Sequence, residues 1–463
     1  MNQFSEMKSV RTVFCVSHKL QYPTISNDKF FPGVAILTAL LVWTSAARAA
    51  ESMRVTLFEA FERVEEANLE ALIQRQAVEE AFQAALEGKA ALLPAVNLNL
   101  TQLRRRSVNA GLGFGEVPLF PPSNRYDGKL VGSVPLLDVV KLAAWRLTKF
   151  DHEISKLTYD GVMQFVLEST TRAYFTHLRN IRRIEVLDTN IVRDKVLLTL
   201  AENQLRAGVA TRIDVTRAEV AIADDEKVRI QQDTVVMASA LRLKLLLDLD
   251  LDVNLEVVMM DPLKPIPVRA YGLDAQILLG ARPEYLKAVK ELERNRVARR
   301  LAGFESLPTV NLFAEWGFAS REFLDGNAEE AWLAGIVFDV PIFEGFRIRS
   351  SKRRADAFVR IQEFTVRDIE QNIGADYRLA IQDAESRFKQ IAVVVKRAKL
   401  GEEELELAQT RFTEGVADNR EVIDAQASLA EANDELIETV YQYNLSRLNL
   451  ASVRGDIRLI LSE

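Results

Sequence analysis

The chain of 463 residues has few of the residue types on which most catalytic and metal sites depend. It contains one cysteine, Cys15, and three histidines, of which His152 and His177 stand far apart within one long helical pattern and cannot share a site. Glycine-rich phosphate loops, nucleophile elbows and clusters of metal ligands are also missing. The sequence therefore predicts a protein that is not an enzyme, with no catalytic residue, no cofactor and no metal.

A long apolar run is missing as well. After residue 43 no stretch of about 18 apolar residues remains, so no transmembrane helix is predicted. Residues 30–43 are apolar but too short to span a bilayer. They follow a segment with several lysines and an arginine and precede Ala47-Arg48-Ala49, which fits the small-x-small pattern of signal cleavage. We interpret residues 1–49 as a secretory signal peptide, with a membrane anchor as the alternative.

Removal of this segment changes the composition of the mature chain. Cys15 leaves with it, so the mature chain has no disulfide and no cysteine for lipid attachment. Five basic and two acidic residues leave too, which changes the formal net charge from −7 to −10. An acidic chain without a clustered basic face argues against nucleic acid as a partner.

What the chain does contain is a long-range repeat. Three pairs of similar segments recur in the same order: 93–98 with 307–312, 134–138 with 340–344, and 205–210 with 412–417. Each half follows the pattern helix, β-hairpin, very long helix, tight turn and helix, which is typical of an internal duplication. We therefore predict a first structural repeat over 50–257, an equatorial linker over 258–273 and a second structural repeat over 274–463.

The two longest helical patterns have almost no helix breakers. Residues 139–207 and 346–414 contain no proline, and at a rise of ~1.5 Å per residue each would be ~100 Å long as a helix. Helices of this length must lie against equally long partners. Four shorter predicted helices provide such partners when they are stacked end to end in two pairs: 212–247 with 274–306, and 419–454 with 53–92.

Alternating apolar and polar residues predict four strands of about 8–11 residues in two hairpins, with loops over 104–127 and 319–330. Two hairpins cannot close a barrel, because the smallest membrane barrels have about 8 strands. Lone hairpins are only marginally stable in water. The strands must therefore be completed by other copies of the chain, with a bilayer against their apolar face. Ordinary hairpins of a soluble domain are the alternative.

The duplication, the two proline-marked hairpins, the turns at 208–211 and 415–418, and the helix start at 418–429 resemble the TolC-type outer-membrane efflux channel family, the outer membrane factors. The resemblance covers about 53–455. It implies a mixed, mainly α fold. In that fold a homotrimer forms a 12-stranded outer-membrane β-barrel, continued by a 12-helix periplasmic α-barrel, and each protomer is an internal duplication.

The resemblance also implies a function. Such a channel is the exit duct of a tripartite efflux or secretion system in a Gram-negative-type envelope. It lies in outer-membrane lipid, reaches into the periplasm, and docks through a periplasmic adaptor (membrane fusion) protein to an inner-membrane pump. The alternative is a periplasmic coiled-coil adaptor or scaffold without a membrane barrel. An adaptor would carry a lipoyl-like half-motif and one helical hairpin, whereas two helical hairpins and paired strands are predicted here.

The first candidate site comprises the two turns between paired helices: Gly208, Val209, Ala210 and Thr211 in the first repeat, and Gly415, Val416, Ala417 and Asp418 in the second. Glycine can adopt the left-handed conformation that ends a helix. Thr211 and Asp418 are predicted to cap the next helix, in capping boxes with Asp214 and Glu421. Capping leaves the small apolar residues unexplained, since they gain nothing at a tip unless a partner covers them. The resemblance implies that the adaptor covers them, and plain turn chemistry is the alternative.

The second candidate site is a pair of acidic residues just after the second turn. Glu421 and Asp424 are three residues apart and therefore share one helical face. They match the acidic ring at the entrance constriction of the family, which the resemblance implies excludes anions and binds cations. The matching positions of the first repeat are Asp214 and Arg217. For Glu421 a capping role is the alternative, whereas Asp424 lies too far along the helix to cap it.

Overall fold

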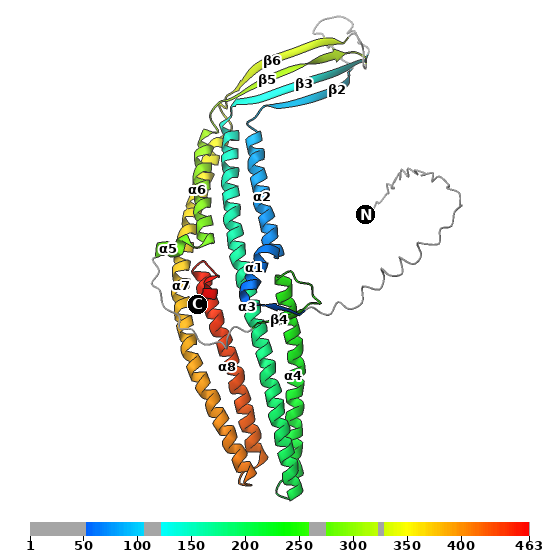
Figure 1. The fold of residues 1–463 in the computed structure, drawn as a ribbon. Coiled ribbons are helices and arrows are strands. Elements are labelled where there is room, and N and C mark those ends of the chain that lie inside the picture. The colour runs from blue at the N-terminus through cyan, green and yellow to red at the C-terminus, as the bar shows by residue number, and fades with distance from the viewer. Residues whose placement is uncertain (1–51, 106–121, 259–274, 323–327, 463) are drawn as a thin grey trace, which may run out of the picture. The chain divides into compact units, whose positions relative to one another are not determined.

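The computed structural model describes residues 52–105, 122–258, 275–322 and 328–462 (Figure 1). The expected signal peptide at 1–49, the linker at 258–273 apart from Val258, and most of the first hairpin loop lie outside these ranges. Within them the fold is mainly helical, with one four-stranded sheet and one small two-stranded sheet. Among the described helices, none is both long and apolar enough to cross a membrane.

The first helical segment is divided, where the sequence predicted one helix over 53–92. Strand β1 (Ser52–Val55) precedes α1 (Leu57–Ala67) and α2 (Leu69–Ala90). The break between the helices is at Asn68, whose side chain accepts hydrogen bonds from the first N–H groups of α2 and donates to the Leu246 carbonyl at 2.8 Å. A side chain that caps one helix and ties it to another explains why a continuous helix is not formed here.

The main hydrophobic core lies where β1 and α1 pack against the long helix α3 (Val139–Ala207). Strand β1 pairs in parallel with β4 (Asn254–Val257), a pairing that the sequence did not predict. Tyr174 of α3 is fully buried under this small sheet and donates its hydroxyl to the Val258 carbonyl at 2.7 Å. The pairing fixes the end of the first repeat beside its own beginning.

The long helices occur where the sequence predicted them. Helix α3 spans the whole of the predicted 139–207, and α7 (Arg347–Thr413) is one residue shorter at each end than 346–414. Their hairpin partners are α4 (Arg212–Leu246) and α8 (Asn419–Val453). The predicted helix at 274–306 is divided into α5 (Ala275–Gly280) and α6 (Pro283–Phe304), because Pro283 occupies the first turn of a new helix.

The end-to-end stacking of the shorter helices differs from the prediction. Both α2 and α4 pack along α3, whereas α6 and α8 pack along α7 and also contact α3 (Figure 1). The stacked pairs are therefore α2 with α4 and α6 with α8, not 212–247 with 274–306. The summed lengths of two stacked helices could not distinguish these pairings, because either pairing gives a total close to the length of one long helix.

The four-stranded sheet is antiparallel and has the order β2-β3-β5-β6. Its strands are β2 (Ala95–Arg105), β3 (Ser123–Leu137), β5 (Thr309–Ser320) and β6 (Glu329–Asp339). They extend into the predicted loops at 104–127 and 319–330, and β3 has 15 residues instead of the 8–11 expected. The central pair β3–β5 joins the hairpins of the two repeats.

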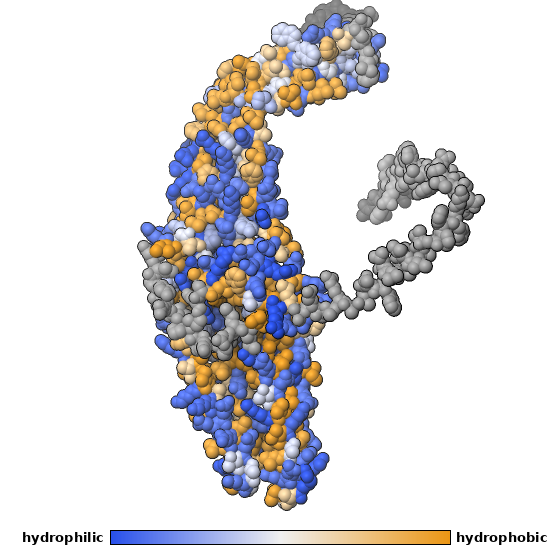
Figure 2. Space-filling model, in the orientation of Figure 1, coloured by the Kyte–Doolittle hydropathy of each residue, from blue (hydrophilic) through white to orange (hydrophobic). Residues whose placement is uncertain are grey.

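Hydrophobic side chains are exposed where the strands meet the helices (Figure 2). They include the following residues: Leu136, Leu137, Val340, Ile342 and Phe343. Along β2 every residue is exposed, including apolar ones that alternate with polar neighbours. An exposed apolar sheet surface of this kind is unfavourable in water, so it requires either lipid or further protein against it.

Candidate functional site

The turns that end α3 and α7 have the same geometry. Gly208 has φ of 78° and Gly415 has φ of 71°, so both adopt the left-handed conformation that the sequence predicted. The N–H of Val209 donates to the Gln204 carbonyl at 3.0 Å, and the N–H of Val416 donates to the Arg411 carbonyl at 2.9 Å. A Cβ atom at either glycine would meet nothing within 4 Å, so backbone conformation alone requires glycine.

This geometry gives a direct prediction for the turn. Gly415→Ala should cost about 1–2 kcal/mol, because an L-residue is strained in the left-handed region. Gly374→Ala is a matched control within α7. Gly374 is helical and has only ordinary contact at 3.5 Å, so alanine there should stabilise by about 0.5–1 kcal/mol. Amide hydrogen exchange in the α7–α8 turn should rise in Gly415→Ala and stay unchanged in Gly374→Ala, and equal exchange in the two variants would contradict the assignment.

The caps of the two returning helices differ. The Asp214 carboxylate accepts from the Thr211 backbone N–H at 2.8 Å and from its hydroxyl at 2.6 Å, which forms the reciprocal part of the predicted box. In the second turn Asp418 accepts from the Glu421 N–H at 3.3 Å, but the Glu421 carboxylate lies 3.3 Å from Arg411. The predicted capping box at Glu421 is therefore wrong: only its Asp418 half forms, since Arg411 at the end of α7 attracts the carboxylate.

Two side chains that the sequence did not single out hold the turns together. Gln204, at the end of α3, donates to the Phe412 carbonyl of α7 at 3.0 Å. Asn419, fully buried at the start of α8, donates to the Asp214 carbonyl of α4 at 2.8 Å. Apolar side chains of α3, α7 and α8, among them Phe412 and Val422, form a small core beside these contacts. The two tips therefore lie side by side within one protomer.

The tips carry exposed apolar side chains. Val209 is 72% exposed and Val416 is 68% exposed, whereas Ala210 and Ala417 are partly buried. The two valine side chains are therefore exposed and cover no part of their own chain. Paired apolar side chains on adjacent tips offer a surface that a partner could cover.

The acidic pair near the second turn is divided between two environments. Glu421 faces Arg411, as described, whereas Asp424 lies on the solvent side of α8, 3.7 Å from Arg420. Both side chains of the latter pair are 72% exposed, so the ion pair is weak. In the first repeat Arg217 lies 3.8 Å from Asp214. Asp424 is thus the more exposed of the two predicted entrance carboxylates.

The two histidines of the described chain lie in separate packing environments. His177 is buried with Nδ1 at 2.8 Å from the Ser239 hydroxyl, and burial, aided by Lys244, lowers its pKa. His152 packs against Phe82, with ring centroids 5.4 Å apart. Among the described residues, no group of three or more His, Cys, Asp or Glu side chains is arranged to hold a metal ion.

Comparison with known proteins identifies the family. The model of the outer membrane efflux protein family matches residues 45–247 and 275–456. The outer membrane protein TolC of Escherichia coli is 23% identical over 414 residues, which cover 81% of this chain and 77% of that protein. The matched residues include both helical hairpins and all four strands of the larger sheet.

Solved structures show the same fold. The outer membrane channel CmeC of Campylobacter jejuni superposes with a TM-score of 0.74 at 16% identity, covering 86% of this chain and 85% of that chain. The outer membrane protein VceC of Vibrio cholerae gives a TM-score of 0.73 at 16% identity, covering 86% of this chain and 96% of that chain. The chain therefore belongs to the outer membrane efflux protein family and is a channel of the Gram-negative outer membrane.

Proposed function

We propose that the protein is the exit duct of a tripartite efflux or secretion system, which passes substrates from an inner-membrane pump and a periplasmic adaptor to the outside. This proposal rests on the different surfaces at the two ends of one protomer. One end is a sheet with an exposed apolar surface, and the other is a pair of helical hairpins with exposed valines at their turns. The first end suits lipid, and the second suits a protein partner.

The open edges of the sheet support assembly as a homotrimer. Within the described residues, β2 and β6 each pair with a single neighbour, so both outer edges of the sheet are free. Free edges of this length readily pair with another chain. Four strands from each of three copies would close a barrel of twelve, with β6 of one copy against β2 of the next. Such closure satisfies every edge, which a bilayer requires.

The two repeats are proposed with the boundaries predicted from the sequence, 50–257 and 274–463 joined by 258–273. Equivalent elements follow in the same order in both: α2 and α6, the two β-hairpins, α3 and α7, and α4 and α8. The small β1–β4 sheet then lies wholly within the first repeat. The long helices of the two repeats would alternate around the trimer axis to give the wall of the duct.

Mass measurement tests the proposed assembly. The detergent-extracted protein should have three times the protomer mass and should fractionate with the outer membrane. A stable monomer would contradict the proposed barrel, because one protomer cannot satisfy its own sheet edges. Recovery with the inner membrane or in the periplasm would favour the alternative, an adaptor or scaffold without a barrel.

A further inference from the structure

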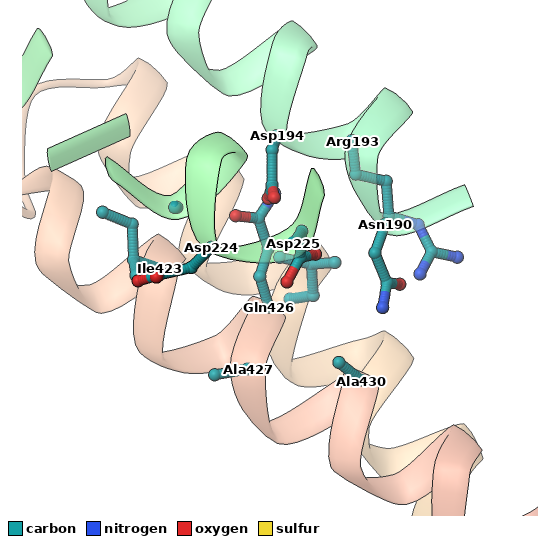
Figure 3. A pocket seen from close by; sticks show the side chains of 11 residues that line it. Asn190, Arg193, Asp194, Asp224, Asp225, Ile423, Gln426, Ala427 and Ala430 are labelled. Atoms are coloured by element: carbon teal, nitrogen blue, oxygen red, sulfur yellow. The ribbon is translucent and has the colours of Figure 1, made fainter. Parts of the chain in front are cut away.

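A small cavity lies between the two helical hairpins, some distance from the turns (Figure 3). Its volume is about 130 Å³, and residues of α3, α4 and α8 line it, with Leu405 of α7 at one side. Its polar lining includes Asp194 of α3, Asp225 of α4 and Gln426 of α8. Neither the fold nor the proposed duct requires carboxyl groups at this position.

The two aspartates line one cavity from neighbouring helices, Asp194 from α3 and Asp225 from α4. Asp194 is only 6% exposed. Burial, together with the charge of Asp225 and the hydrogen bond to it, raises the pKa of Asp194 to about 6. Burial also raises the pKa of Asp225. The hydrogen bond with Asp194 opposes this shift, and the charges of Asp224 and Asp434 act in the same direction as burial. Two carboxylates in hydrogen-bond contact repel one another when both are ionised, so the pair retains a proton well above the usual pH for an aspartate.

The charges around the pair do not neutralise it. Among the described residues that line the cavity, the one cationic side chain is Arg193, which is partly buried on α3. Asp224 adds a further negative charge from α4. Asp434 of α8, which acts on Asp225, is itself bound by Arg183 at 3.0 Å. Helix α7 contributes only the apolar Leu405 to the lining.

The opposite wall of the cavity holds a polar group without a partner. The side-chain nitrogen and oxygen of Gln426 are both buried, and neither has a hydrogen-bond partner in the structure. A buried amide in this state costs free energy, so it favours any arrangement that supplies an acceptor or donor. The carboxyl pair on α3 and α4 lines the same cavity, together with the polar side chains of Asn190, Arg193 and Asp224 (Figure 3).

The cavity lies between two groups of contacts that join the hairpins. On one side, Arg179 and Arg183 of α3 bind Glu438 and Asp434 of α8. On the other side are the turn contacts of Gln204 and Asn419. The cavity is therefore flanked on both sides by contacts that join the hairpins, and its α8 wall at Gln426 is close to Asp424.

We propose that Asp194 and Asp225 share one proton and form a pH-dependent clamp between α3 and α4, and that loss of this proton loosens the packing of that hairpin against α8. In the protonated state Asp194 donates its O–H to the Asp225 carboxylate. When the proton leaves to solvent, the two carboxylates repel, and one of them turns to the Gln426 amide as an acceptor. Acidification of the periplasm then tightens the hairpins, and neutral pH loosens them.

The direction of the stability change follows from the same pair. The folded protein binds the Asp194 proton with a pKa of about 6, above the ordinary value of 3.8. Between these pH values the folded state therefore holds more protons than the unfolded state. Stability falls as pH rises through this window and is constant above it. An asparagine at position 194 keeps a donor towards Asp225 at every pH and removes this dependence.

The test uses the full chain in its native assembly, extracted in detergent. Thermal midpoints are measured from about pH 4.5 to pH 8 for the native protein, Asp194→Asn and Asp225→Asn. The native midpoint should fall as pH rises to about 6. Either variant should flatten the profile and raise the midpoint at pH 7. The matched control is Asp224→Asn, which removes an adjacent exposed charge. It should retain the slope, over a window shifted to lower pH because this charge raises the pKa of Asp225.

A second measurement tests the connection to α8. Amide exchange across residues 419–430, corrected for the intrinsic rate, should slow on acidification in the native protein but not in Asp194→Asn. If Asp194→Asn retains the native dependence of the thermal midpoint on pH, the two aspartates do not share a proton. If exchange in α8 is independent of pH, the pair does not act as a clamp. Failure of both asparagine variants to assemble would also overturn the clamp, because asparagine reproduces the protonated pair. None of these readouts uses export, so they are independent of the proposed duct.

Discussion

Replacing Val209 and Val416 together with aspartate should abolish export while leaving the assembled protein intact. Both side chains are exposed at the tips and cover nothing in their own chain, so their replacement removes little folding free energy. If an adaptor covers them, each aspartate would place a charge without a partner in an apolar contact, which is strongly unfavourable. Loss of export from cells that produce the variant in place of the native protein measures the effect.

The control for this prediction is an equally exposed valine far from both turns. Val393 of α7 is 69% exposed, compared with 68% for Val416. Val393→Asp adds the same charge to the same kind of surface and should leave export unchanged. Mass and thermal stability are measured for all variants. Tip variants that fail to assemble would show that the turns are folding elements, and tip variants that export normally would remove the docking assignment.

The elements that the sequence predicted well are those whose signal is long. Helix α3 follows from 69 residues without a proline, and the left-handed turns follow from Gly208 and Gly415. The sheet follows from alternation, although β3 is longer than predicted because polar and small residues continue its pairing with β2 and β5. These features depend on local chemistry, which a single sequence records.

The features that were missed depend on which surfaces meet. The four residues of β1 become a strand only because β4 lies beside them, about 200 residues later in the chain. The local pattern at Glu421 predicts a capping box, but Arg411 of the preceding helix attracts its carboxylate. Asp194 and Asp225 are on different helices, and in the sequence each one alone resembles an ordinary solvent-exposed carboxylate. Only the folded hairpin brings them to one cavity, where Asp194 is buried and Asp225 is partly buried.

The entrance assignment predicts a second large effect. In the proposed trimer three copies of Asp424 would converge near the axis of the duct, where their negative charges favour cations over anions. The ion pair with Arg420 is highly exposed and does not cancel this field. Asp424→Ala should therefore lower the cation preference of the reconstituted pore. Block by divalent or trivalent cations should weaken by about tenfold, which corresponds to about 1.4 kcal/mol of ion binding.

Planar-bilayer conductance separates this role from helix capping. Asp424→Glu retains the charge and should retain both selectivity and block. Glu421→Ala removes a carboxylate that Arg411 already binds, so it should change permeation less than Asp424→Ala does. Asp418→Ala removes the side chain that caps α8 and should cost about 1 kcal/mol of local stability without loss of cation block. If Asp424→Ala keeps the native selectivity and block, three converging carboxylates do not form the constriction, and the mouth must be lined by other residues.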